Sequence, residues 1–428
     1  MALESVFTKL LILISICTQY SSCCSSDSDC SLLGECKKGK CVCDPGWKGK
    51  NCGQVDLLPA PRDLSNDRYG GYRNASLSTW GGKAIKIGHK WHMFASGMSH
   101  NCTLSNFATN SMSIHATSAT PGGPYSLEDI ASPEFHHSTT VVQVNHSTLA
   151  LFTIGKDMHG QNVHNCETFI TENSEAVGTL NSTENDKKEL GPHDYMSVHI
   201  STSGPYGPWD EKVIFKTNLS EPEAWNCNRS NPAPLIFPNG TVLMMYRGES
   251  CTHPDPDHSC HNATINLCEH QGIAVADSID GPFRDRQGKI SELSGNEDAV
   301  FFRTRRGYAA LFHSKNACGQ GAEHENCGSL AYSKDTWSWT LNSEASYNGT
   351  FQWKEANGDV TTDHLLSRQR PKIIFSEDGI TPLFLTNGVL TSQKMWDGMQ
   401  WTDGKQFTVA APFNVPQNQK MTKEASFY

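Results

Sequence analysis

The sequence has no excess of basic residues, no long hydrophobic run and almost no helical periodicity. Its 428 residues contain 35 Lys and Arg against 45 Asp and Glu, a net charge of −10, with no basic stripe of the kind that binds phosphates. We therefore expect no nucleic-acid partner. The single apolar run, Leu10–Cys17, is much shorter than the ~20 residues that cross a bilayer. We predict no membrane span in the mature protein.

The N-terminus has the order of a secretory signal peptide. Lys9 precedes the apolar run, and small and polar residues follow it to Ser26. We predict a signal peptide at residues 1–23 and a secreted, extracellular protein, because sixteen cysteines suit a compartment in which disulfides persist. Cleavage between Cys23 and Cys24 would leave fourteen, an even number. Nine Asn-X-Ser/Thr sites are predicted to carry glycans: Asn74, Asn101, Asn145, Asn181, Asn218, Asn228, Asn239, Asn262 and Asn348.

Six cysteines crowd into the first part of the mature chain, which is too short for a hydrophobic core and must be held by bridges. Spacing alone leaves fifteen pairings open. Gly46 and Gly49 supply turns, and we expect Trp47 to cover the disulfides. The cysteines are Cys24, Cys30, Cys36, Cys41, Cys43 and Cys52.

The Cys-X-Cys pair, the Gly-aromatic step and the final cysteine after eight intervening residues resemble an epidermal-growth-factor-like (EGF-like) module at residues 24–53. The resemblance implies the bridges Cys24–Cys36, Cys30–Cys41 and Cys43–Cys52. It implies no bound calcium, because the usual acidic pattern before Cys30 is missing. Such modules serve as spacers or adhesive units, so matrix proteins are possible partners.

After a Pro-containing linker at residues 54–66, short apolar runs alternate with Gly, Pro, Asn and Asp turns, which indicates β structure. Five segments share one plan of polar opening, apolar strand, turn and second apolar strand. We predict an all-β fold with a five-bladed β-propeller at residues 67–415 and a tail at 416–428; a pair of β-sandwiches is the alternative. The five segments are Trp80–Ala95, His137–Ile154, Asn231–Arg247, Glu297–His313 and Arg370–Leu385.

A further strand of small and β-branched residues follows four of these segments, and in three cases a Gly-Pro-aromatic turn closes it, as at Gly281-Pro282-Phe283. This pattern resembles the five-bladed propeller glycoside hydrolases, the arabinanase, β-xylosidase and levanase-like superfamily, over about residues 67–415. The resemblance is one of strand pattern and does not include a catalytic signature.

In a propeller the inner strands line the central channel, so their polar openings should converge at one mouth. They offer an aromatic ring, imidazoles, an amide, a carboxylate and a guanidinium, an inventory that suits a carbohydrate ligand. The predicted substrate-binding residues are Trp80, His136, His137, Asn231, Glu297 and Arg370.

Hydrolysis of a glycoside needs two carboxyl groups roughly 5–9.5 Å apart. The resemblance implies carboxylates at the first and third openings, where this chain has Trp80 and Asn231. Glu297 and Asp298 are adjacent, so we expect them to point to opposite faces of their strand. Asp298 is our candidate catalytic residue, with Asp67 or Asp194 as a second acid. The alternative is a non-catalytic sugar-binding or adhesion propeller of the matrix.

The remaining cysteines lie mostly in long insertions, which we expect at the rim opposite the pocket. Cys318–Cys327 is a plausible local bridge, and the other pairs stay open. The insertion Cys251–His261 has metal-like residue types without the regular spacing of a zinc site, and we interpret it as a disulfide-closed loop. We predict no metal and no cofactor, since no phosphate-cradling or dinucleotide motif is present.

Overall fold

We describe a computed structural model. It describes residues 24–157, 162–166, 193–251, 269–314, 317–318, 326–391 and 406–416, and the predicted signal peptide lies outside them. Strands dominate; the helical elements are η1 (Asp27–Cys30), η2 (Leu64–Asn66), η3 (Leu104–Asn106), α2 (Phe107–Asn110) and η5 (Ser291–Leu293). Among these residues no helix has the length and apolarity needed to cross a membrane.

Four antiparallel sheets follow one another along the chain, each with its four strands in sequence order. Their strands are β8 (Ser78–Ile87), β9 (Lys90–Met98), β10 (Ser111–Ser118) and β11 (Ser126–Ser132); β12 (His136–Gln143), β13 (Leu149–Gly155), β14 (Tyr195–Ser201) and β15 (Asp210–Lys216); β16 (Asn228–Ile236), β17 (Val242–Glu249), β18 (His270–Ala276) and β19 (Arg284–Asp285); and β20 (Asn296–Arg303), β21 (Tyr308–Ser314), β22 (Gly328–Ser333) and β23 (Thr340–Leu341).

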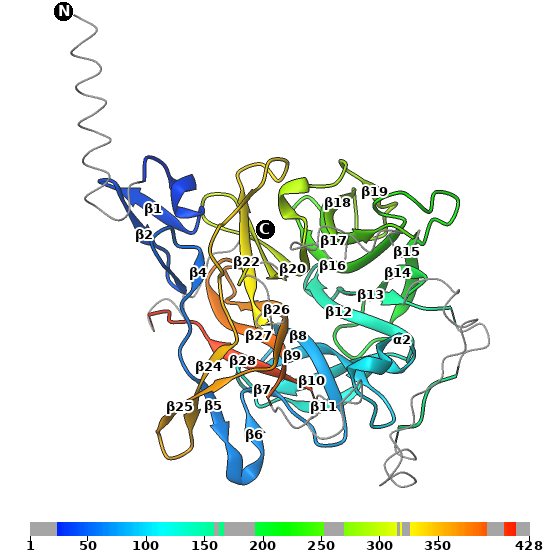
Figure 1. The fold of residues 1–428 in the computed structure, drawn as a ribbon. Coiled ribbons are helices and arrows are strands. Elements are labelled where there is room, and N and C mark those ends of the chain that lie inside the picture. The colour runs from blue at the N-terminus through cyan, green and yellow to red at the C-terminus, as the bar shows by residue number, and fades with distance from the viewer. Residues whose placement is uncertain are drawn as a thin grey trace, which may run out of the picture.

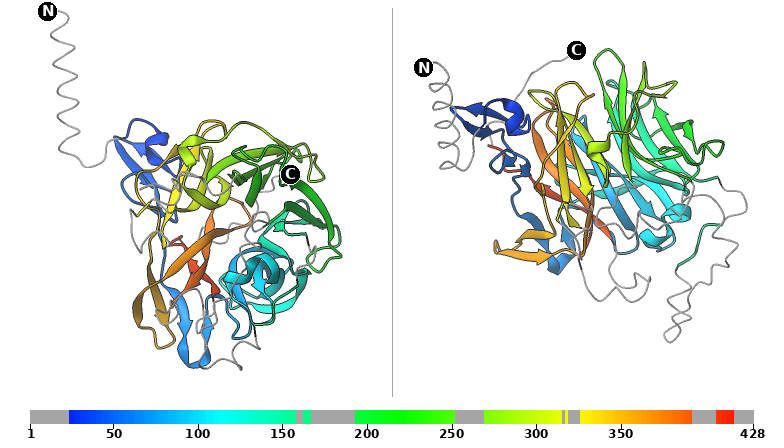
Figure 2. Two further views of the ribbon diagram at one scale, coloured as in Figure 1. Left: turned by 45° about the vertical axis from the view of Figure 1, so that its right-hand side comes forward. Right: turned by 45° about the horizontal axis from the view of Figure 1, so that its top comes forward.

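A fifth sheet joins the two ends of the propeller. It contains β26 (Ser367–Phe375), β27 (Pro382–Leu390), β28 (Phe407–Pro412) and, from the start of the chain, β7 (Gly71–Tyr72), which pairs with β28. The first strands of the five sheets, β8, β12, β16, β20 and β26, each contact the next, and β26 contacts β8. Figures 1 and 2 show the sheets arranged around a common centre. The predicted five-bladed propeller is confirmed.

The predicted linker is not an irregular tether. Its strand β4 (Gln54–Val55) pairs with β3 (Trp47–Lys48), and β5 (Ala60–Asp63) joins a further four-stranded sheet with β6 (Arg68–Tyr69), β24 (Thr350–Glu355) and β25 (Val360–His364). Two parts of the linker, one of which contains Pro61, therefore form short strands that attach the module to the propeller.

The EGF-like module packs directly on the propeller. It contains β1 (Gly34–Lys37) and β2 (Lys40–Cys43), and it holds the bridges Cys24–Cys36, Cys30–Cys41 and Cys43–Cys52, the pairing that the resemblance implies. Trp47 is 6% exposed, with its ring centroid 6.0 Å from that of Phe302 and 5.9 Å from that of Phe413. Trp47 thus joins the module to the propeller core, where we had expected it only to cover disulfides.

Candidate functional site

Each inner strand carries one extra residue near its beginning. The pairing with the second strand of the blade shifts register at this point in all five blades. The extra residue has a left-handed backbone, which is uncommon outside glycine and re-aims the side chain. The five residues and their φ angles are Gly81 (66°), Ser138 (59°), Asn231 (52°), Asp298 (58°) and Arg370 (48°).

These five bulge residues meet in the channel. Asn231 Nδ2 donates to Asp298 Oδ1 at 2.5 Å, and Arg370 Nη1 donates to Ser138 Oγ at 2.6 Å. Arg370 Nε lies 3.5 Å from Asp298 Oδ1. A residue larger than glycine does not fit at position 81, because its Cβ would lie only 2.8 Å from Arg370 Cβ. The bulges therefore form one layer, in which the hydrogen-bonded pairs Asn231–Asp298 and Ser138–Arg370 are joined by the Arg370–Asp298 ion pair and Gly81 packs against Arg370.

The bulge overturns our expectation that Glu297 and Asp298 point to opposite faces. Strand alternation fails at Asp298 because the extra residue breaks the period of two. Both side chains line the same pocket, and carboxyl oxygens of the two residues lie within 4.8 Å of each other.

The guanidinium of Arg247 is shared by three carboxylates on one side of the pocket. Arg247 Nη1 lies 2.5 Å from Glu297 Oε2 and 3.2 Å from Glu269 Oε1, while Nη2 lies 3.2 Å from Glu249 Oε2. Burial alone would lower the pKa of Arg247, but these carboxylates raise it. Glu297 Oε1 also lies 3.0 Å from His313 Nδ1. Glu297 therefore has two partners, Arg247 and His313, one at each carboxyl oxygen.

The cavity above the bulge layer, which we call the channel-mouth pocket, has a volume of about 210 Å³. It brings together six predicted site residues: Trp80, His137, Asn231, Glu297, Asp298 and Arg370. Its other lining residues are Leu104, Phe107, Ile154, His193, Ser230, Arg247 and Gln369.

Two imidazoles in this pocket are kept neutral. His137 Nδ1 lies 2.7 Å from Ser111 Oγ, and its ring lies against Phe107 with centroids 5.0 Å apart. Burial lowers the pKa of His137, and the nearby Arg370 lowers it further. Burial and the charge of Arg247 lower the pKa of His193 to about 3. Neutral imidazoles can donate to or accept from a ligand hydroxyl.

Trp80 is part of the buried wall of the pocket and does not offer an exposed ring face on which a sugar could stack. It is 2% exposed and packs with Met98, Cys102, Leu104 and Phe107. The half-buried Phe107 is the more accessible ring. It was not among our candidates, because it lies in an insertion and outside the repeated strands.

Three predicted residues do not line the channel-mouth pocket. Asp67 is exposed beyond β5 and η2 and pairs with Arg73 at 2.7 Å. Asp194 accepts a hydrogen bond from the backbone N–H of Asp157 at 2.8 Å and so shapes the loop that carries His193. His136 lies in a separate cluster between strands of the second blade.

That cluster has the residue types of a metal site. His136 Nε2 lies 3.0 Å and His199 Nε2 3.8 Å from Glu211 Oε1. Burial raises the pKa of Glu211, but the hydrogen bond and charge of His136 lower it to about 2. The hydrogen bond between His136 Nε2 and Glu211 Oε1 accounts for this geometry without an ion, and our expectation of no metal stays a prediction.

The described ends of the long insertions lie at the channel mouth, not at the opposite rim as we expected. Each follows the second strand of its blade, which runs antiparallel to the inner strand and so returns to the mouth. The bridge Cys102–Cys166 packs beside Trp80 at this rim, and Cys227–Cys251 closes the third blade. Cys318–Cys327 is also present. Most of the metal-like loop after Cys251 lies outside the described residues.

The site combines charge with many hydrogen-bonding groups in a small space. The guanidinium of Arg370 and the amide of Asn231 are donors, the carboxylates accept, and Phe107 offers a ring face. Such a mixture orients a polyhydroxylated ring by bidentate hydrogen bonds and apolar contact. Within the described residues, the lining carboxylates both come from β20.

Comparison with known proteins agrees with the two parts of the fold. Residues 24–55 match the family described as Teneurin-like EGF domain. No curated protein matches the chain.

Solved structures resemble the chain over most of its length, and three of them have a TM-score of 0.50. The α-L-arabinofuranosidase PaAbf62A from Podospora anserina, in complex with cellotriose, is 10% identical and covers 84% of this chain and 98% of its own. A structure described as a glycoside hydrolase is 12% identical with coverages of 88% and 94%. The chain therefore carries a Teneurin-like EGF domain at residues 24–55 and shares its propeller fold with glycoside hydrolases.

Proposed function

We propose that this chain is a secreted carbohydrate-binding protein whose channel-mouth pocket holds one sugar unit of an extracellular polysaccharide. The observation that carries the proposal is the set of bulge residues Asn231, Asp298 and Arg370, which line the pocket together and give it a polar floor. The pocket volume of about 210 Å³ is below the ~300–1,000 Å³ of pockets that enclose a drug-sized ligand. A single sugar unit of a longer chain fits this size.

Secretion is supported by the EGF-like module and by six disulfides among the described residues. Such bridges persist outside the reducing cytosol. The predicted signal peptide at residues 1–23 supports the same compartment. Adhesion to matrix proteins through the EGF-like module remains a separate prediction.

Glycoside hydrolysis is the second candidate function, and the closeness of the Glu297 and Asp298 carboxyl groups favours it. Two features weigh against it. Both carboxylates come from β20, whereas acid and base must flank the scissile bond. Both carboxyl oxygens of Glu297 already have partners, Arg247 and His313, whereas a general acid must direct its proton at the leaving oxygen of the substrate. We therefore place binding before hydrolysis.

A polysaccharide panel tests both functions in one experiment. The secreted protein is incubated with neutral and acidic plant, algal and microbial polysaccharides, and retained glycan and released sugars are measured by mass spectrometry. We expect the wild-type protein to retain at least one glycan. Asp298→Asn should abolish this retention, whereas Asp67→Asn, a matched change outside the pocket, should leave it unchanged. Release of sugars that Asp298→Asn abolishes would establish hydrolysis. If Asp298→Asn retains the glycan as well as the wild type does, binding in the channel-mouth pocket is refuted.

A further inference from the structure

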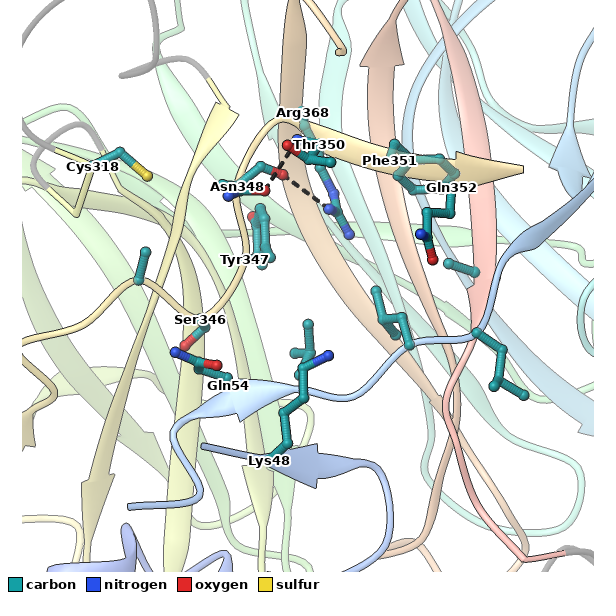
Figure 3. A pocket seen from close by; sticks show the side chains of 15 residues that line it. Lys48, Gln54, Cys318, Ser346, Tyr347, Asn348, Thr350, Phe351, Gln352 and Arg368 are labelled. Atoms are coloured by element: carbon teal, nitrogen blue, oxygen red, sulfur yellow. Dashed lines mark hydrogen bonds between the residues drawn. The ribbon is translucent and has the colours of Figure 1, made fainter. Parts of the chain in front are cut away.

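A second and larger cavity lies between the EGF-like module and the propeller. Its volume is about 490 Å³, and we call it the module–propeller pocket. Figure 3 shows its lining side chains. They come from β3, residues 54–58, residues 345–352 and the start of β26, together with Cys318 and Ala411. It is separate from the channel-mouth pocket, with which it shares no lining residue.

The inner wall of this pocket contains a buried cation with only neutral partners. Arg368 is 2% exposed; its Nε donates to Asn387 Oδ1 at 3.1 Å and its Nη1 to the Asn348 backbone oxygen at 3.0 Å. Its Nη2 makes no hydrogen bond. The rings of Tyr347 and Phe351 lie 4.4 and 5.0 Å from its Cζ. Burial lowers the pKa of Arg368 to about 10, so it remains charged at neutral pH.

The charge of Arg368 is not balanced within the pocket. None of the described residues that line it is acidic. Lys48 adds a second cation, and Figure 3 shows Lys48 and Arg368 extending toward each other from opposite sides. Lys48 Nζ lies 3.3 Å from Asp56, but this pair is exposed and weakly coupled. A buried cation without a counter-ion favours an anion at the adjoining surface.

Arg368 also links the two pockets. It is followed along β26 by Gln369 and Arg370, which line the channel-mouth pocket. A glycan that leaves the channel mouth across the start of β26 would reach the module–propeller pocket. The amide of Gln352 and the amide oxygen of Gln54, whose Nε2 donates to Glu344 Oε2 at 3.4 Å, offer hydrogen bonds to sugar hydroxyls.

We propose that the module–propeller pocket binds the acidic group of an anionic oligosaccharide, either a uronate carboxylate or a sulfate ester. The saccharide part of this inference rests on the proposed function, whereas the preference for an anion rests on Arg368, Lys48 and the absence of acidic residues from the described lining. Both acidic groups carry a negative charge and at least two terminal oxygens, which can accept parallel hydrogen bonds from a guanidinium and a charged contact from an ammonium group.

The test compares acidic probes with neutral ones by titration calorimetry. The probes are an oligogalacturonate, its carboxyl-reduced form, a sulfated oligosaccharide and its desulfated form. We expect at least one acidic probe to bind about tenfold more tightly than its neutral counterpart, the effect of one well-placed charge-assisted contact. The preferred probe distinguishes carboxylate from sulfate. The affinity ratio should fall as salt concentration rises.

Two substitutions of equal charge locate the site. Gln352→Glu adds a carboxylate to the exposed lining of the pocket and should remove the acidic preference. Gln143→Glu makes the same change at the far end of β12 and should leave it intact. Lys48→Gln should weaken it partially. None of these variants alters the buried Arg368, so loss of folding does not confuse the result.

Asn348 is a predicted glycosylation site on the edge of the pocket, so the titrations use glycosylated and enzymatically deglycosylated protein. The inference is overturned by equal affinity for acidic and neutral probes, by a preference that Gln352→Glu leaves unchanged, or by a preference confined to deglycosylated protein. Binding of neutral probes tests the channel-mouth pocket. If only acidic probes bind and Asp298→Asn does not change their affinity, the proposed function is wrong while the anion site in the module–propeller pocket is supported.

Discussion

Replacement of Trp47 by alanine tests whether the EGF-like module is part of the propeller's stability. The ring is 6% exposed and packs between Phe302 and Phe413 of the propeller. Truncation of a large aromatic side chain in a core typically costs about 3–5 kcal/mol, through lost burial and the cavity left behind. The same core cluster contains Ile373 and Leu385 of β26 and β27, so the loss should reach the blades.

The assay is denaturant unfolding followed by far-UV circular dichroism, with calorimetry to count transitions. Trp337→Ala is the control, since Trp337 is 51% exposed and stacks on Arg286, whose Cζ lies 3.8 Å from the ring. Loss of that exposed contact should cost about 1 kcal/mol or less. If Trp47→Ala leaves the main propeller transition where it is in the wild type, the module is only a spacer and this reasoning is refuted.

Three further predictions concern the channel mouth. The pKa of His193 is lowered in the folded protein, so its contribution to stability is fully present above the unfolded pKa near 6.5 and is lost as pH falls toward about 3. His193→Gln should flatten this loss, measured as the free energy of unfolding between pH 7 and 4. An unchanged slope would contradict this prediction. Arg247→Met should cost about 3–5 kcal/mol in denaturant unfolding, because it leaves Glu297 buried without its cation, with Arg247→Lys recovering part; equal stability of Arg247→Met and the wild type would disprove the pairing. Double replacement of Cys102 and Cys166 by serine removes a bridge of sequence separation 64. The loop-closure entropy of such a bridge corresponds to about 4 kcal/mol, so the melting temperature should fall. An unshifted melting temperature would refute a stabilising role.

The repeats predicted the propeller because each inner strand must bury its apolar residues and also open with polar ones at the channel. Trp80, His137, Asn231, Glu297 and Arg370 start the five repeated segments, and all of them line the channel-mouth pocket. The regular strand period did not predict the bulges. An extra residue in one strand is invisible in an apolar pattern that continues normally on either side of it.

Other parts of the site depend on contacts between distant segments. Arg247 ends the third repeat, and its position on the returning second strand could have marked it as a mouth residue. His193 and Phe107 lie in insertions without a repeated pattern. The position of the insertions was predicted wrongly because we referred them to the inner strand, whereas Cys102 and Cys166 follow second strands.

The docked EGF-like module was also missed. Its Pro-containing linker has the composition of a tether, and only the tertiary structure shows β4 and β5 pairing with β3 and β24. A buried Trp47 is consistent with a self-contained module as well as with a docked one, so the residue alone does not decide between them.

The most direct test of the channel-mouth pocket is a crystal structure of the protein soaked with the oligosaccharide that the panel selects. The account predicts a sugar ring above the bulge layer, with hydroxyls bonded to Arg370 and Asp298 and a face against Phe107. An oligosaccharide bound elsewhere on the propeller, with the channel-mouth pocket holding only water, would contradict it.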